Sequence, residues 1–369
     1  MRADARALVL EAPRQLVARD LPLPELGVDD GLLRVEACGL CGTDHEQWSG
    51  MLHPGRPFVP GHEIVGVIAA AGPEAAARWG AEPGDRVAVE VFQSCRACKA
   101  CRSGDYRHCE AHPRWHSYGF CGVEHAPGLW GGYADTVYLA PDAVLLPVPE
   151  TLDPVLATVF NPLGAGIRWA AQLPDTKPGA VVAVLGPGIR GLCAAVAAKE
   201  AGAGFVMVTG AGPRDAERLA LAARFGADIA VDVAVDDPAR ALREATGGAQ
   251  ADVVVDVTAK APAAFVQAVD LARPGGTVVV AGMRGWAPVE NFIPDLVVLK
   301  ELRIIGALGV DAAAYRPALE LLASGRWPFE DLPRRVVGLD GVDDLLRTMA
   351  GEDTGADVES PPVHGVVVP

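Results

Sequence analysis

The sequence lacks any apolar run long and uninterrupted enough to cross a bilayer, so it predicts no membrane-spanning segment. Its opening stretch, MRADARALVLEAPRQL, has neither the apolar core nor the cleavage site of a secretory signal, and we therefore expect a cytoplasmic protein. Basic residues are also few, because 32 Lys and Arg stand against 47 Asp and Glu, for a net charge of −15. That balance argues against nucleic acid or a membrane surface as a partner.

What is present is a chain of 369 residues, half of them apolar, which is long enough for two domains with cores of their own. It contains eight cysteines. Thiols stay reduced in the cytoplasm, so cysteines there suggest metal binding or chemistry before disulfides.

The pattern of apolar runs changes along the chain. The first part has short β-branched runs between Gly/Pro turns, such as LLRVEAC, EIVGVIAAAG and DRVAVEVF. From AVVAVLGPGIRG onward, apolar runs alternate with helical stretches, for example PARALREAT, ADVVVDVT and APAAFVQAVDLA. This alternation predicts an α/β fold with a doubly wound parallel sheet, inserted into a β-rich lobe built from both chain ends. We expect AGEDTGADVESPPV, near the end, to be a flexible surface loop.

A turn-rich segment, CRACKACRSGDYRHC, has the spacing C-x2-C-x2-C-x7-C and brings together Cys95, Cys98, Cys101 and Cys109. Four thiolates can close a tetrahedral zinc site, and a closed site stabilises a fold without catalysing a reaction. A redox C-x-x-C pair would leave the other cysteines unexplained, and an iron–sulfur cluster is a further alternative. The basic residues of the segment could indicate a nucleic-acid zinc module, but we interpret them as a solvated face: Arg96, Lys99, Arg102 and Arg107.

The stretch VVAVLGPGIRG has a buried β-run before, and an amphipathic helix after, its G-x-G-x-x-G turn. This context predicts a dinucleotide site, with the pyrophosphate at the helix N-terminus. The candidate residues of the turn are Gly186, Gly188, Ile189, Arg190 and Gly191.

The next strand should end at FVMVTGAGPRDAER, where enzymes that prefer NAD carry an acidic residue. Thr209 and Gly210 stand there instead, and Arg214 or Arg218 could bind a 2′-phosphate. Asp215 is a possible substitute acid. We therefore expect loose discrimination between NAD and NADP.

Two shorter motifs, CGTD in CGLCGTDHEQW and GHE in PGHEIVG, are weak signals when taken alone. Together with the four-cysteine segment, the GPGIRG turn, KELRIIGALG and ALELLASGRW, the chain resembles the zinc-dependent medium-chain dehydrogenase/reductase family over essentially its whole length. That family includes alcohol, polyol, threonine and glucose dehydrogenases. The resemblance implies a GroES-like catalytic domain over residues 1–156 and 306–369, and a Rossmann domain over 157–305.

The resemblance also implies a catalytic zinc held by Cys41 and His62, with Asp44 orienting the ligand histidine. Glu63 lies next to the ligand and can itself bind the metal, while Asn161, in TVFNPLGAG, matches the position of the family's third ligand. An amide is neutral and binds zinc more weakly than a carboxylate, so we expect Glu63 and Asn161 to share that contact. Asn161 could instead only cap its helix or hold a water molecule.

Proton transfer should begin at Thr43, whose counterpart in the family passes the alcohol proton outward. The family often has a histidine at the position of Glu46, whereas here the histidine is His45, one residue earlier. The outer member of the relay therefore stays open between these two residues. Four aromatic residues are candidates for the substrate pocket, although aromatic residues are more often core: Trp48, Phe92, Trp115 and Trp130.

The function implied is zinc-dependent, NAD(P)-linked oxidation of an alcohol to an aldehyde or ketone, with the alkoxide held on zinc and NAD slightly favoured. A metal-free reductase of the same superfamily and a non-catalytic zinc and nucleotide binder are the alternatives. Members of the family are usually oligomers, so we expect a homodimer or homotetramer.

Cys38, Cys121 and Cys193 are interpreted as small buried residues. The spacing of the remaining histidines does not commit them to metal: His53, His108, His112, His116, His125 and His364.

Overall fold

The computed structural model describes residues 3–352 and 361–369. It divides into two compact units, the first made of Met1–Asn161 with Asp311–Pro369 and the second of Pro162–Val310. The predicted loop AGEDTGADVESPPV lies for the most part outside the described residues. Among the described residues, no helix combines the length and apolar character needed to cross a membrane.

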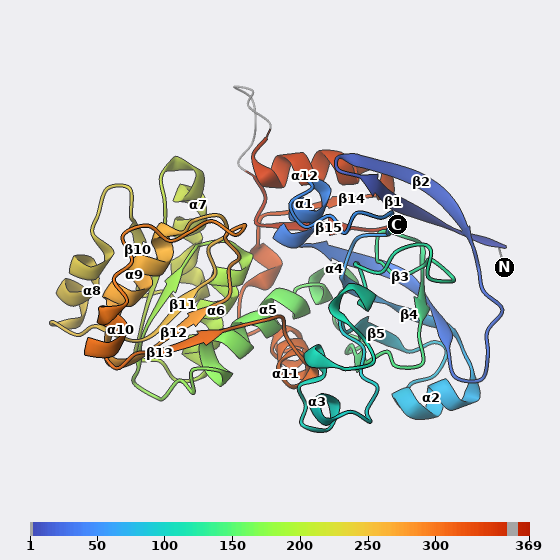
Figure 1. The fold of residues 1–369 in the computed structure, drawn as a ribbon, viewed down its shortest axis with the longest axis horizontal. Helices are drawn as coiled ribbons and strands as arrows, with labels where there is room; N and C mark the ends of the chain where they lie inside the picture. The colour runs from blue at the N-terminus through green and yellow to red at the C-terminus, as the bar shows by residue number, and fades with distance from the viewer. Residues whose placement is uncertain (1–2, 353–360) are drawn as a thin grey trace. The chain divides into compact units, whose positions relative to one another are not determined.

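The first unit contains a seven-stranded sheet built from both ends of the chain (Figure 1). Its order is β14-β15-β3-β4-β5-β7, with β6 paired to β3 as well. Its pairs are antiparallel except β14–β15, and the C-terminal strand β15 pairs with β3 through Gly365 and Leu40. The strands are β3 (Gly31–Leu40), β4 (Glu63–Ala71), β5 (Arg86–Val89), β6 (Thr136–Leu139), β7 (Leu145–Pro147), β14 (Arg334–Val337) and β15 (His364–Val367).

A hairpin of β1 (Asp4–Ala12) and β2 (Gln15–Pro22) joins this unit and was not predicted from the sequence. The inward side chains of β1, β3 and β4 share one core, in which Val9, Leu33 and Ile64 are fully buried. The helices of the unit are α1 (Gly42–Trp48), α2 (Pro73–Trp79), α3 (Lys99–Arg102), α4 (Pro154–Ala157), α11 (Ala312–Ala323) and α12 (Val342–Ala350). A further helix, α5 (Phe160–Gly166), begins at the end of this unit.

The second unit contains a six-stranded sheet of order β10-β9-β8-β11-β12-β13, in which every pair is parallel. The strands are β8 (Val181–Leu185), β9 (Phe205–Gly210), β10 (Ile229–Asp232), β11 (Ala251–Asp256), β12 (Ala272–Val280) and β13 (Arg303–Gly306). The helices between them are α6 (Ile189–Glu200), α7 (Ala216–Ala222), α8 (Pro238–Thr246), α9 (Ala263–Leu271) and α10 (Asp295–Leu299). The sheet confirms the predicted doubly wound α/β fold.

The strand order locates the place where a ligand would bind in this unit. Counted along the unit, the order is that of the Rossmann fold, and it reverses at β8, which has β9 on one side and β11 on the other. Ligands of such sheets bind beyond the carboxyl ends of the strands at this point. The glycine turn that follows Leu185 lies directly there.

Candidate metal centres and coenzyme site

The first candidate centre consists of Cys41, His62 and Glu63. Cys41 follows β3, and His62 immediately precedes β4, whose first residue is Glu63. Gly39 of β3 pairs with Glu63 of β4. This register brings Cys41 close to His62 and Glu63 although it is distant from them in sequence, which their spacing in the chain does not reveal. Their ligand atoms lie within 4.8 Å of one another, and all three residues are buried.

Asp44 holds the two ligand-bearing segments in place. Its Oδ2 accepts a hydrogen bond from the backbone N–H of Cys41 at 2.8 Å, as part of the capping box of α1. Its Oδ1 accepts one from the backbone N–H of Gly61 at 3.2 Å and lies 3.5 Å from Nδ1 of His62. A carboxylate behind the ligand histidine favours the tautomer whose Nε2 is free to bind metal, which is the role predicted for Asp44.

Two glycines make room for the centre. A Cβ at Gly39 would lie 2.3 Å from Oε2 of Glu63, so only glycine leaves the space that this carboxylate occupies. Gly61 has a φ of +88°, and a Cβ there would lie 2.6 Å from the ring of Tyr133. Gly39 therefore leaves room for the Glu63 carboxylate, and Gly61 lets the backbone pass Tyr133 directly before His62.

The electrostatics of the centre fit a divalent cation. Burial alone would lower the pKa of His62. The interactions with Asp44 and Cys41 raise it by more than burial lowers it, so that the pKa lies well above its ordinary value. A proton held there is one that a metal ion would displace. A thiolate, an imidazole and a carboxylate are all zinc ligands, and Cys41 with Glu63 would balance the charge of Zn²⁺.

The remaining predicted residues of this centre have the following places. Oγ1 of Thr43 lies 3.7 Å from Sγ of Cys41. Nε2 of His45 lies 3.2 Å from Oε1 of Glu352, whereas Glu46 is buried with 8% of its surface exposed.

Asn161, near the start of α5, is 2% exposed. Its Nδ2 donates a hydrogen bond to the hydroxyl of Tyr315 at 2.8 Å, and the ring of Phe160 packs edge-on against Tyr315. These contacts fix the orientation of the amide. Sequence reasoning did not identify Tyr315 as its partner.

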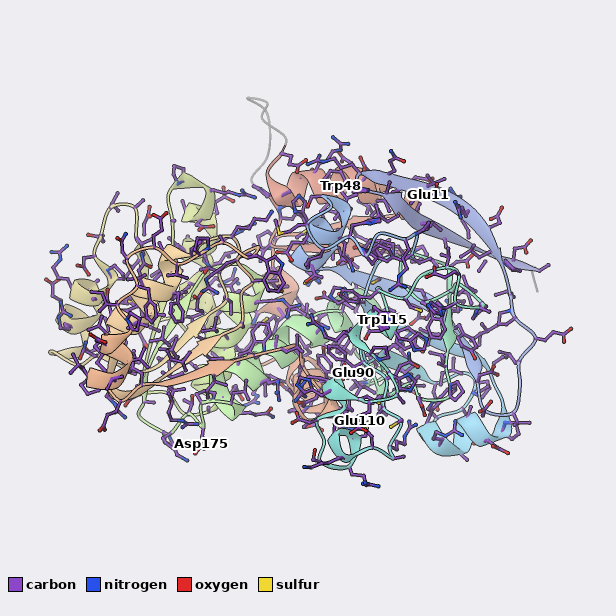
Figure 2. All side chains as sticks on the ribbon, in the orientation of Figure 1. Glu11, Trp48, Glu90, Glu110, Trp115 and Asp175 are labelled. Atoms are coloured by element: carbon purple, nitrogen blue, oxygen red, sulfur yellow. The ribbon has the colours of Figure 1, made fainter. Side chains whose placement is uncertain are left out.

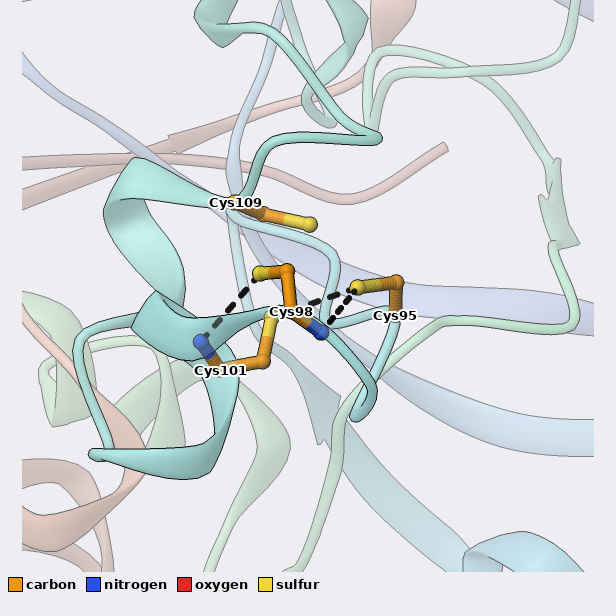
Figure 3. A group of neighbouring side chains, drawn as sticks. All are labelled: Cys95, Cys98, Cys101 and Cys109. Carbon is orange, nitrogen blue, oxygen red and sulfur yellow. Dashed lines mark hydrogen bonds between the residues drawn. The ribbon is translucent and has the colours of Figure 1, made fainter.

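The second candidate centre is the four-cysteine segment (Figure 3). The sulfur atoms of Cys95, Cys98, Cys101 and Cys109 lie within 4.8 Å of one another. The backbone N–H of Cys98 donates to Sγ of Cys95, and that of Cys101 to Sγ of Cys98, each at 3.4 Å. N–H donors from Glu110 and Cys101 lower the pKa of the Cys98 thiol to about 6, which favours the thiolate that zinc binds.

The segment is anchored by buried polar contacts. Arg107 is paired with Asp105 and with Asp311, and only 3% of its side chain is exposed. The interpretation of Arg107 as part of a solvated face is therefore wrong, because Asp311, distant in sequence, supplies a buried counter-charge. Lys99 and Arg102 are exposed, as predicted.

Glu90, labelled in Figure 2, is fully buried and contacts Tyr106 of this segment. The hydroxyl of Tyr106 donates to its Oε2 at 2.7 Å and accepts a hydrogen bond from the backbone N–H of Ala312 at 2.6 Å. Burial raises the pKa of Glu90 to about 8. The residue therefore holds a proton in the folded chain at pH values where an exposed glutamate would have lost it.

The coenzyme turn has the geometry that its motif requires. Gly186 has a φ of +106°, and a Cβ at Gly191 would lie 1.8 Å from the carbonyl oxygen of Gly186. A Cβ at Gly188 would meet nothing within 4 Å, so space is open where a pyrophosphate would approach. Ile189 begins α6, and the guanidinium of Arg190 lies 5.4 Å from the centre of the Trp169 ring.

The end of β9 carries no acidic residue. Thr209 is buried, and Gly210 lies close to Asp215, whose Oδ2 accepts a hydrogen bond from the backbone N–H of Ala211 at 2.9 Å. Arg218 lies 3.6 Å from Asp215, and Arg214 is exposed. Asp215 and Arg218, which follow this strand, are thus close neighbours.

The four aromatic candidates for the substrate pocket lie in different surroundings. Trp48 and Trp130 belong to the core of the first unit, and Nε1 of Trp48 donates to Asp343 at 2.9 Å. Trp115, labelled in Figure 2, is 47% exposed, and Phe92 is half-buried. The pocket assignment stays a prediction.

Sequence reasoning missed one cluster of potential ligands. His116, Cys121 and His125 place one ligand atom each within 4.8 Å of one another. Cys38 and Cys193 are buried as predicted, but Cys121, which is also buried, has two histidines beside it. The spacing H-x4-C-x3-H within one short segment was the available signal.

Comparison with known proteins gives matches over both units. Residues 27–150 match the family model of the alcohol dehydrogenase GroES-like domain, and residues 191–324 match that of zinc-binding dehydrogenases. A Mycobacterium tuberculosis protein named as a probable alcohol dehydrogenase is 68% identical over 100% of this chain and 99% of its own. The sorbitol dehydrogenase of Bacillus subtilis is 32% identical over 87% of each chain.

Solved structures agree with these matches. A Sinorhizobium meliloti protein assigned as a zinc-binding dehydrogenase and bound to NADP is 29% identical, covers 100% of both chains and has a TM-score of 0.82. An alcohol dehydrogenase from Thermus sp. ATN1 is 26% identical over 98% of this chain and 99% of its own, with a TM-score of 0.83.

Proposed function

The chain belongs to the zinc-dependent medium-chain dehydrogenase family and, on that premise, we propose that Cys41, His62 and Glu63 form the centre at which it oxidises an alcohol with NAD or NADP. The observation that carries the proposal is the buried convergence of a thiol, an imidazole and a carboxylate within 4.8 Å. The products are an aldehyde or ketone and the reduced coenzyme, and the reaction is reversible.

When bound, zinc acts as a Lewis acid that makes a coordinated alcohol easier to deprotonate. A nicotinamide coenzyme held at the glycine turn would supply the acceptor for the hydride that the alcohol loses. Thr43, whose Oγ1 lies 3.7 Å from Sγ of Cys41, would accept the alcohol proton at that oxygen and release its own hydroxyl proton toward the outer member of the relay. His45 is the better candidate for the outer member of the relay, because its Nε2 faces Glu352, which is 28% exposed, whereas Glu46 is buried.

The third protein ligand is proposed to be Glu63, with Asn161 sharing the contact. Cys41, His62 and Asn161 alone would leave the site with a charge of about +1, because the amide is neutral. Glu63 restores neutrality, and the space above Gly39 already accommodates its carboxylate. Zinc content and turnover of Glu63→Ala and Asn161→Ala test this assignment. It is wrong if both variants keep a full catalytic zinc and full activity.

The four-cysteine segment is proposed to hold a structural zinc. Its four thiols would occupy every position of a tetrahedron and leave none for substrate. The N–H···S bonds of Cys98 and Cys101 support a metal-bound state, since they stabilise thiolate over thiol.

The coenzyme is proposed to bind at the glycine turn within the domain predicted over residues 157–305, with little choice between NAD and NADP. Arg218 can attract a 2′-phosphate, while its neighbour Asp215 can accept hydrogen bonds from a ribose 2′-OH. Because these two charges lie 3.6 Å apart, neither coenzyme is strongly rejected.

We place the enzyme in the cytoplasm, because all eight cysteines are free thiols and the proposed zinc sites need them reduced. We also propose that it forms a homodimer or homotetramer, as its family usually does, and light scattering of the purified protein tests this.

The function is tested by following coenzyme reduction with a panel of alcohols and polyols, with and without a zinc chelator. The proposal predicts turnover with at least one alcohol, lost on complete removal of zinc and regained when zinc is returned. Turnover that survives full removal would support the metal-free reductase instead. The panel also identifies the substrate.

A further inference from the structure

The cluster of His116, Cys121 and His125 lies in the segment between the four-cysteine loop and β6. Its three ligand atoms are within 4.8 Å of one another, the same criterion that the two other centres meet. Cys121 is fully buried, His116 is half-buried and His125 has 44% of its side chain exposed. The cluster is therefore reachable from solvent on one side and closed on the other.

The backbone at each of these residues is already fixed. The carbonyl oxygen of His116 accepts a hydrogen bond from Nε2 of Gln93 at 2.7 Å. The carbonyl oxygen of His125 accepts one from Nε1 of Trp130 at 2.8 Å, and the N–H of Cys121 donates to Ser117 at 3.1 Å. A site whose ligands are held in advance needs little further ordering when an ion binds.

His112 links the cluster to a carboxylate. Nε2 of His112 lies 2.7 Å from Oδ2 of Asp142, and Nδ1 of His112 lies 3.3 Å from Nδ1 of His116. In the tautomer of His112 that donates from Nε2 to Asp142, its Nδ1 can accept a hydrogen bond from Nδ1 of His116, which leaves Nε2 of His116 available to a metal ion. Carboxylate-to-histidine chains of this kind orient ligands in metal sites.

A further acidic group lies beside the cluster. Oε1 of Glu124 is 3.7 Å from Nε2 of His125, and a Cβ at Gly122 would lie 2.0 Å from Oε2 of Glu124. The carboxylate is thus folded back against the segment that carries Cys121. One thiolate and two neutral imidazoles would leave a zinc ion with a charge of about +1. Oε1 of Glu124 also lies 3.3 Å from Nη1 of Arg56, so this carboxylate is shared between the guanidinium and the cluster.

We propose that His116, Cys121 and His125 form a third metal site that takes a zinc ion, separate from the two zinc sites of the proposed function. One sulfur and two imidazole nitrogens are borderline-soft donors, the set that suits this ion. The fourth position would be filled by water or by Glu124. The bound ion would fix the segment from His116 to His125, in which the centre of the Phe120 ring lies 5.7 Å from that of the His62 ring.

The test is the zinc content of the full-length protein after equilibration with excess zinc and removal of loosely held ions by gel filtration. His125→Gln is the main variant because the side chain is partly exposed and its loss should not prevent folding. Cys121→Ser is the second variant. His53→Gln and Cys193→Ser are the matched controls, since neither residue belongs to a candidate centre.

We expect the wild-type chain and both controls to hold one more zinc per chain than His125→Gln and Cys121→Ser. His112→Phe should keep that zinc at saturation but bind it about 10- to 100-fold more weakly in a competition titration. Equal zinc content in the wild-type protein and His125→Gln overturns the proposal, as does a site that takes up copper but no zinc. Because the comparison is between variants, it does not depend on how fully the Cys41 site is loaded.

Discussion

Replacement of Asp44 by asparagine is the most informative single change at the proposed catalytic centre. The carboxylate accepts backbone hydrogen bonds from Cys41 at 2.8 Å and from Gly61 at 3.2 Å, and Oδ1 lies 3.5 Å from Nδ1 of His62. An amide of the same shape can still accept one of these two hydrogen bonds through its oxygen. Its NH₂ group then faces the other backbone N–H, and two donors cannot bond to each other. Asp44→Asn therefore changes hydrogen bonding and charge with almost no change in volume.

Two effects should follow. One buried N–H, that of Cys41 or Gly61, loses its acceptor, which should lower the free energy of unfolding by about 1–3 kcal/mol. In the orientation that keeps the Cys41 bond, the amide NH₂ faces His62 and favours a lone pair on Nδ1, which moves the ring proton to Nε2, where the metal should bind. Loss of such an orienting partner should weaken zinc binding by about 10- to 100-fold.

Zinc affinity is measured by competition with a chromophoric chelator, and stability by calorimetry on the same samples. Asp256→Asn is the matched control, because Asp256 is also a buried carboxylate and accepts a backbone hydrogen bond from Thr258 at 3.0 Å, but it lies in the second unit. It should lose stability without losing zinc. If Asp44→Asn binds zinc as tightly as the wild-type protein, Asp44 does not orient His62 and the reasoning fails.

Three further predictions concern the rest of the molecule. Cys98→Ser should lower stability by several kcal/mol while the folded fraction stays active, because a closed zinc site contributes only folding energy, and an unchanged melting temperature would argue against a structural zinc. The ratio of kcat/KM for NAD and NADP should stay below about 1000-fold, or ~4 kcal/mol, and a stronger preference for either coenzyme would contradict a site shared by Arg218 and Asp215. Burial raises the pKa of Glu90 from 4.5 to about 8, so the folded chain holds a proton that the unfolded chain releases in this range, and stability should fall as the pH rises through it. Glu90→Gln should remove that pH dependence. The melting temperature of the variant minus that of the wild type should therefore increase from about pH 5 to about pH 9. Parallel curves for the two proteins would refute the buried proton.

The sequence predicted those features that depend on local pattern. PARALREAT coincides with α8, whose start is marked by Asp237 as the N-cap and Pro238 in the first turn. The glycine turn was identified because strand, turn and helix are contiguous, and the structure adds only the positive φ of Gly186 and the tight contact at Gly191.

Features that depend on partners distant in sequence could not be predicted from the sequence. Nothing near Arg107 in the sequence reveals that Asp311 pairs with it, or that Tyr315 receives the amide of Asn161. His116 and His125 flank Cys121 closely in sequence, but their convergence depends on a segment without regular helix or strand periodicity. Hydrophobic periodicity does not predict the structure of such a segment.

The central claim is that the zinc held by Cys41, His62 and Glu63 carries the alcohol chemistry, and His62→Ala tests it most directly. Turnover, zinc content and coenzyme affinity should be measured on the same folded preparation. The account predicts that this variant loses zinc from the catalytic centre and alcohol turnover together, while coenzyme binding and the zinc of the four-cysteine site are retained. A His62→Ala protein that oxidises the alcohol at the wild-type rate would contradict it.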